Sequence, residues 1–158
     1  MGFELRERDL LLEIGHVALA RGLFDESLQI MDGLVRLCPD APHPRIGRAL
    51  TLFVMGQESL ALDVLHETIA LFPRAIFARS LLAKFMKQLG LPDAASVARE
   101  VLAMDPPAFV ADIAREVIRE GTGEAEKGDE SGGHAHEARQ YADGKGFAYP
   151  VGYRGTFV

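Results

Sequence analysis

Apolar residues recur with helical spacing along roughly the first 120 residues of the chain, in segments that end at a glycine or a proline. From Leu11 to Leu19 they mark one side of a helix, with a new apolar position every third or fourth residue. A second segment runs from Leu28 to Leu37 and stops before Pro39. The pattern therefore predicts short helices that are paired through tight turns.

Landmarks of three kinds return along the chain at an interval of 34 residues. They are the turn glycines Gly22, Gly56 and Gly90, the small residues Ser27, Ala61 and Ala95, and the prolines Pro39, Pro73 and Pro107. Glycine readily adopts the left-handed conformation that ends many helices, and a small side chain lets two helix axes approach closely. The sequence thus predicts three helix-turn-helix repeats, at residues 8–41, 42–75 and 76–109.

The amino-acid composition changes after the third repeat. Residues 108–120 have one apolar and one charged face, as expected of a helix that caps a repeat array and faces water. Residues 121–146 contain seven glycines and almost no large apolar residue, which predicts a flexible linker. The repeats and the cap are therefore expected to form one folded part, residues 1–120.

An aromatic tail, residues 147–158, follows the predicted linker. Its aromatic residues alternate with small ones, a period of two that is typical of an extended segment. We consider two roles, a disordered end and a docking element for this chain or a neighbouring copy. The docking residues would be Phe147, Tyr149 and Tyr153.

The repeats also place a small residue in the first helix of each unit, at Gly15, Ala49 and Ala83. Together with the landmarks above, this arrangement resembles the tetratricopeptide repeat (TPR) family over residues 8–120. The resemblance implies an all-α fold, a right-handed α-solenoid of three TPR repeats with a capping helix, here followed by a disordered C-terminal tail. The chain departs from the family where Arg45 and Arg48 occupy places that are usually buried, so we expect their aliphatic stems to cover the core and their guanidinium groups to reach water.

The net charge and the composition limit which classes of partner and which cellular location we expect. The net charge of -6 at pH 7 argues against nucleic acid and anionic membranes, since both attract basic surfaces. The N-terminus has charged residues where a signal peptide would be apolar, and no apolar run has the length of a membrane span. We therefore expect a cytoplasmic protein, and we expect the single Cys38 to be a buried hydrophobe near a helix end.

Motifs of catalysis and cofactor binding are missing from the sequence. It has no glycine-rich phosphate loop, no pair of cysteines and no HExxH motif. His134 and His136 are close in sequence but have no further metal ligand nearby. We therefore expect a protein that is not an enzyme and has neither a cofactor nor a metal site.

The resemblance implies that three positions of the first helix in each repeat line a concave groove, which here is apolar in the first two repeats and cationic in the third. We predict that it binds a protein or peptide through an amphipathic helix whose acidic end meets the two lysines. The alternative is that some of these residues belong to the ordinary core. The candidates are Leu12, His16, Leu19, Ile46, Leu50, Phe53, Phe77, Lys84 and Lys87.

One known type of TPR site does not match this sequence. TPR domains that bind the C-terminal carboxylate of heat-shock proteins use Lys, Asn and Arg at positions that are matched here by Leu12, His16, Gly47, Phe77 and Leu81. These residues cannot clamp a carboxylate, which argues against a heat-shock co-chaperone of that class.

A compact, acidic, three-repeat array is similar to the small chaperones of bacterial type III secretion, which implies a chaperone or adaptor that holds a partner segment. The alternative is a structural protein of a homo-oligomer or larger complex, in which the tail docks on a neighbour.

Overall fold

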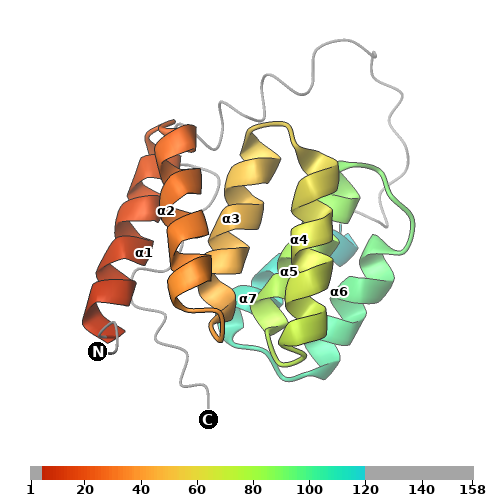
Figure 1. Ribbon diagram of the computed structural model, residues 1–158. Helices are drawn as coiled ribbons and strands as arrows, with labels where there is room; N and C mark the ends of the chain where they lie inside the picture. The colour runs from red at the N-terminus through yellow and green to blue at the C-terminus, as the bar shows by residue number, and fades with distance from the viewer. Residues whose placement is uncertain (1–4, 120–158) are drawn as a thin grey trace. The chain divides into compact units, whose positions relative to one another are not determined.

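The computed structural model describes residues 5–119, and all regular structure in this part of the chain is α-helical. The helices, labelled in Figure 1, are α1 (Leu5–Ala20), α2 (Phe24–Leu37), α3 (Pro42–Val54), α4 (Glu58–Leu71), α5 (Ile76–Gln88), α6 (Ala94–Ala103) and α7 (Ala108–Arg119). The predicted all-α architecture of three helix pairs and a last helix is thus confirmed. The predicted linker and the aromatic tail, with Phe147, Tyr149 and Tyr153, lie outside the described residues.

The described residues fall into two compact units. Residues 5–57 form the first unit, with α1, α2 and α3, and residues 58–119 form the second, with α4 to α7. None of the helices in this part of the chain combines the length and the apolar character that crossing a membrane requires.

The three glycines spaced by 34 residues end three helices in the same way. Gly22, Gly56 and Gly90 have φ values of +77°, +77° and +64°, in the left-handed region where a side chain would be strained. At Gly22 the amide donates to Leu19 O, and the next amide, of Leu23, donates to Ala18 O. The same two bonds recur at the other two glycines. This pair of bonds is the Schellman motif, which confirms the glycine positions as helix ends.

In the first unit, α2 packs against both α1 and α3 (Figure 1). Met31 of α2 is fully buried and lies between two helical glycines, Gly15 of α1 and Gly47 of α3. A Cβ atom on Gly15 would lie 2.6 Å from Met31 Cε, and one on Gly47 would lie 2.5 Å from Met31 Sδ. A side chain at either position would therefore require the Met31 thioether to move.

A buried pair of hydroxyl groups joins the same helices. Ser27 Oγ of α2 and Thr51 Oγ1 of α3 are 3.0 Å apart, and Thr51 Oγ1 donates to Gly47 O at 2.9 Å. Because the Thr51 proton is used in that bond, Ser27 donates to Thr51 and both buried hydroxyls are satisfied. Ser27 is therefore more than a small residue: it also links α2 to α3.

In the second unit, α5 packs against α4, α6 and α7 (Figure 1). Its side chains Leu81 and Phe85 are buried, as are Leu65 of α4, Val101 of α6 and Val110 of α7. The predicted small residue Ala61 of α4 is fully buried as well. The core of this unit thus gathers around α5.

The third repeat differs in detail from the prediction. Proline fits the first turn of a helix, so the sequence predicts that the second helix of this repeat starts at Pro92. Instead, α6 starts at Ala94, after Asp93 with a φ of +69°. In α6, Ala95 is only half-buried, and Ala94 and Ala98 take the buried positions instead.

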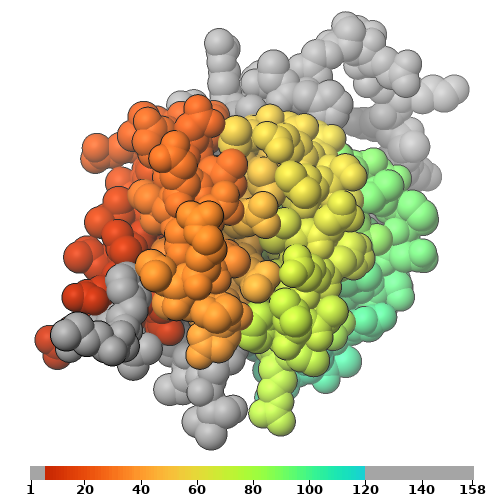
Figure 2. Space-filling view, in the orientation of Figure 1, coloured from red at the N-terminus to blue at the C-terminus, as the bar shows by residue number. Residues whose placement is uncertain are grey.

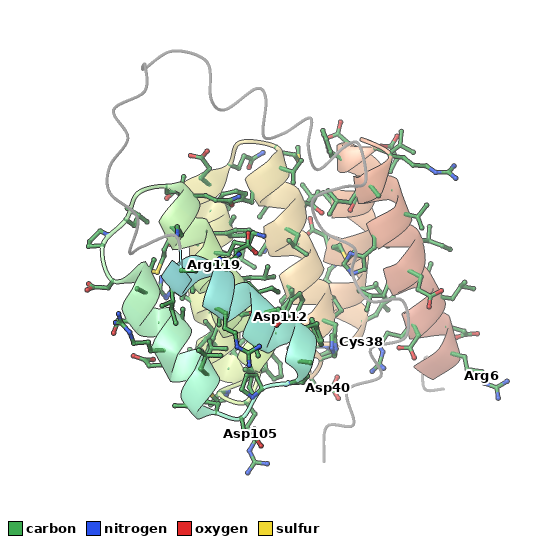
Figure 3. The ribbon with its side chains drawn as sticks, turned by 180° about the vertical axis from the view of Figure 1, so that it is seen from behind. Arg6, Cys38, Asp40, Asp105, Asp112 and Arg119 are labelled. Atoms are coloured by element: carbon green, nitrogen blue, oxygen red, sulfur yellow. The ribbon has the colours of Figure 1, made fainter. Side chains whose placement is uncertain are left out.

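Two smaller predictions have different outcomes. Cys38 is buried where α2 ends (Figure 3), as expected. Arg48 is half-buried, and its Nε lies 2.8 Å from Asp32 Oδ1 of α2, with about a third of each side chain exposed. We had expected the guanidinium group of Arg48 to reach water. In the structure it also forms an ion pair with Asp32.

The glycines around Met31 provide a test of the packing. We expect Gly47→Ala to lower the free energy of unfolding by up to about 2 kcal/mol, because the overlap of the new methyl group with a buried side chain outweighs the gain in helix propensity. Gly33→Ala is the matched control, since a Cβ at this helical position of α2 meets nothing within 4 Å. That change should raise the stability by up to about 1 kcal/mol through helix propensity.

Urea denaturation monitored by circular dichroism measures both variants. Equal, positive stability changes for Gly47→Ala and Gly33→Ala would contradict the described position of Met31.

Candidate protein-binding surface

The candidate residues of the first unit come from α1 and α3, which contact each other directly. Leu12, His16 and Leu19 of α1 are half-buried, as is Phe53 of α3. Ile46 and Leu50 of α3 are buried, with 1% and 4% of their surface exposed. Ile46 and Leu50 therefore belong to the core in this structure, and the four half-buried residues are the ones with surface available to a partner. Their contact with a partner stays a prediction.

His16 lies against the backbone of α3. Its Cε1 atom would be 3.3 Å from a Cβ on Gly47, so the missing side chain at Gly47 makes room for the imidazole as well as for Met31. Burial, with a smaller contribution from the charge of His43, lowers the pKa of His16 to about 4. His16 is therefore neutral at physiological pH and offers a polar but uncharged ring.

The pKa of His43, at the start of α3, is lowered as well. Burial first, and the Arg8 guanidinium second, lower its pKa, while Asp9 acts in the opposite direction. Arg8 is held by the adjacent Asp9, with its Nη2 2.8 Å from Asp9 Oδ1. This part of the first unit thus combines two imidazoles whose pKa values are lowered with an arginine that forms an ion pair.

The candidate residues of the second unit lie on α5, and all three contact α7. The rings of Phe77 and Phe109 have centroids 5.7 Å apart and are tilted by 59°, a favourable aromatic geometry. Lys84 Nζ lies 3.7 Å from Glu116 Oε2. Lys87 Nζ donates to Val117 O at 2.9 Å, a carbonyl in the last turn of α7.

The contact of Lys87 has a clear physical role. The last four carbonyls of a helix have no partner within the helix, and its C-terminal end carries a partial negative charge. Lys87 satisfies one of these carbonyls and places its positive charge at that end. In this structure the predicted cationic part of the site therefore attaches α7 to α5, and its use by a partner stays a prediction.

Sequence reasoning did not identify Phe109, Glu116 and Val117 as the partners of these residues. The amphipathic pattern of residues 108–120 marked a helix, but the direction of its apolar face toward α5 depends on the rotation of both helices. One feature of the sequence was consistent with this contact: Glu116 is a carboxylate in the predicted capping helix, and in the structure it lies near Lys84 of α5.

The positions that match a carboxylate-binding site have no cation in this structure. Leu12 is half-buried, His16 is neutral, and Gly47 has no side chain. In the second unit Phe77 packs on Phe109, and Leu81 is fully buried. Within residues 5–119, no cluster of three or more His, Cys, Asp or Glu side chains is placed to bind a metal ion.

Solved structures resemble this arrangement of helices. One is the first TPR domain of Spaghetti (RPAP3) bound to the HSP90 peptide SRMEEVD, with a TM-score of 0.61 and 19% identity over 78% of this chain and 99% of that one. The chain has the fold of a TPR domain. The Sgt2 TPR domain from Aspergillus fumigatus matches with a TM-score of 0.60 and 17% identity, over 82% of this chain and 93% of that one. No protein-family model matches the sequence, and no curated protein matches it significantly.

The TPR fold explains the repeating landmarks of the sequence. At these identities the similarity establishes the fold, and the ligand preference has to be argued from the residues of this chain.

The low pKa of His16 predicts how stability depends on pH. The unfolded chain binds a proton at His16 below about pH 6.5, whereas the folded chain binds it only near pH 4, so protons favour unfolding between these values. We expect a loss of about 2 kcal/mol between about pH 7.5 and about pH 5 from His16, with a further loss of the same sign from His43.

Replacing His16 by Gln keeps a polar group and removes the titration. Urea denaturation at several pH values should show a shallower decline for His16→Gln than for the original chain. His66, which is exposed on α4, provides the control, since His66→Gln should leave the profile unchanged. Identical profiles for all three proteins would be incompatible with a buried, neutral His16.

Proposed function

We propose that this chain is a protein-binding module that holds an amphipathic segment of a partner protein, as a cytoplasmic chaperone or adaptor. The observation that carries the proposal is a TPR fold in which neutral and apolar side chains occupy the places of a carboxylate clamp. The fold favours recognition of a protein segment, and these side chains favour an apolar one.

The ligand of the RPAP3 domain differs in chemistry from the apolar segment proposed here. The RPAP3 domain was solved with the peptide SRMEEVD, which has two Glu residues and a C-terminal Asp. A site for such a ligand needs positive charges that compensate its desolvation. In the first unit of this chain, Leu12 and His16 provide none at the matching positions.

Apolar contact supplies the binding energy in this proposal. Leu12, Leu19 and Phe53 are half-buried, so a partner helix that covers them removes further apolar surface from water. At about 25 cal/mol per Å², a few hundred Å² of apolar surface from both partners stabilises a complex by several kcal/mol before ordering terms. The neutral His16 ring adds a polar contact that fixes the register of the bound helix.

The small chaperones of type III secretion are the most specific version of this proposal. They have the size, the acidity and the number of repeats of this chain, and they hold needle or translocator subunits before export. Copurification of this chain with such a subunit from its own host, lost on Leu19→Asp, would support this version. Normal levels and export of all such subunits after deletion of the gene would reject it.

A peptide-binding measurement tests the general proposal. The probes are fluorescently labelled SRMEEVD and an amphipathic peptide of about 18 residues, five helical turns, selected on this chain from a displayed library. We expect the selected peptide to bind at least about tenfold more tightly than SRMEEVD, since only the first matches an apolar, uncharged surface. Tighter binding of SRMEEVD would contradict the proposal.

Two leucines of the first unit provide the variant and its control. Leu19→Asp should weaken binding of the selected peptide by about tenfold or more, whereas Leu37→Asp, at a position of α2 that is 58% exposed, should leave it unchanged. The helical circular dichroism signal of each variant shows whether it is folded. Equal affinities of folded Leu19→Asp and the original chain would place the peptide on another surface.

A further inference from the structure

Aromatic residues are concentrated in the aromatic tail, residues 147–158. Four of its twelve residues are aromatic, namely Phe147, Tyr149, Tyr153 and Phe157, whereas the whole chain is 8% aromatic. Segments that only stay in water are poor in aromatic residues, and protein contacts are rich in them. The composition of the tail is therefore that of a segment with a binding surface.

The charge of the tail suits an apolar and neutral surface. The tail contains no Asp or Glu, whereas the predicted linker, residues 121–146, contains six of them. A carboxylate that is covered by apolar groups loses its hydration without compensation. Of the residues that follow α7, the tail and not the linker therefore matches such a surface.

The first unit offers an apolar and neutral surface on α1 and α3, which contact each other. Leu12 and Leu19 of α1 and Phe53 of α3 are half-buried, so each has apolar surface left to cover. His16, between the two leucines in sequence, is neutral at physiological pH. In Figure 2, α1 (red) is visible beside α2 at the edge of the first unit, so part of α1 is open to solvent. We call these four residues the first-unit site.

The predicted linker is long enough to bring the tail to this site. Its 26 residues have a mean end-to-end distance of about 25 to 30 Å and a full reach of about 90 Å. The longest described helix, α1, has 16 residues and a length of about 24 Å. Attachment of the tail after α7 therefore does not prevent it from reaching α1.

We propose that the aromatic tail binds the first-unit site of its own chain and has to leave before a partner segment can bind there. The inference rests on the proposed function, because it gives the proposed partner surface a second occupant. Alternate side chains of an extended segment share one side, so Phe147, Tyr149, Val151 and Tyr153 can cover the site together.

Attachment to the same chain makes a weak contact sufficient. A flexible linker gives an effective concentration of about 1 mM, so a tail with a Kd of about 100 μM as a free peptide occupies the site in about 90% of the molecules. A partner then finds about one molecule in ten open, which lowers its apparent affinity by about tenfold. The tail thus excludes weak ligands and admits tight ones.

Tyrosine fluorescence measures the docking of the tail directly. The chain has no Trp, and its three tyrosines are Tyr141, Tyr149 and Tyr153, so Tyr141→Phe leaves emission from the tail alone. In the full-length Tyr141→Phe chain, we expect acrylamide quenching to rise at least about twofold when Leu19→Asp is added, because the docked rings lose their shield. Leu37→Asp, at a position of α2 that is 58% exposed, is the matched control and should leave the quenching unchanged.

A change in the tail itself completes the series. Phe147→Ser should also raise the quenching, and it remains informative if Leu19→Asp does not fold. Quenching that responds to neither change would overturn the proposal, as it would if water or another surface surrounded the tail. Shielding that grows with protein concentration would also overturn it, because the tail would then bind a neighbouring copy.

The selected amphipathic peptide separates this inference from the proposed function. The full-length variant with Phe147→Ser, Tyr149→Ser and Tyr153→Ser should bind this peptide up to about tenfold more tightly than the original chain. Equal or weaker binding would overturn occlusion by the tail and leave the proposed function intact. Absence of peptide binding in both chains would contradict the proposed function, while the tyrosine quenching would still decide whether the tail docks.

Discussion

The first unit depends on one close approach, that of Met31 to Gly15 and Gly47. The thioether of a fully buried methionine lies where a Cβ on either glycine would overlap it, so a side chain at either position would require the thioether to move. The same missing side chain at Gly47 admits the ring of His16. A packing constraint in the core therefore fixes the position of a candidate surface residue, and the resulting burial keeps its imidazole neutral.

The second unit is organised by α5, which uses different side chains for its core and for α7. Leu81 and Phe85 are buried, while Phe77, Lys84 and Lys87 reach the ring of Phe109, the carboxylate of Glu116 and a carbonyl of the last α7 turn. An amphipathic helix thus lies on α5 through an aromatic contact, an ion pair and a satisfied helix end. The sequence analysis predicted that the acidic end of a partner helix meets Lys84 and Lys87, and in this structure both lysines contact α7.

The sequence predicted the fold well because its strongest signals are local. A glycine with positive φ ends a helix without any help from tertiary contacts, so Gly22, Gly56 and Gly90 marked three helix ends correctly. The predicted start of α6 at Pro92 was wrong. Proline is compatible with the first turn of a helix but does not require one, and Asp93 adopts a left-handed conformation instead. The position of Met31 could not be predicted, since it depends on how three helices are rotated against one another.

For the candidate surface, too, the sequence could not predict which side chains are buried by tertiary packing. Helical spacing places Leu12, His16 and Leu19 on one side of α1, but spacing alone does not separate the buried Ile46 and Leu50 from the half-buried Phe53. The distinction matters chemically, because only residues with remaining exposed surface can gain energy by covering it. In the first unit that surface belongs to two leucines, one phenylalanine and a neutral imidazole. This set of side chains is the basis of the proposed apolar ligand, since an acidic ligand would lose hydration against apolar and neutral groups.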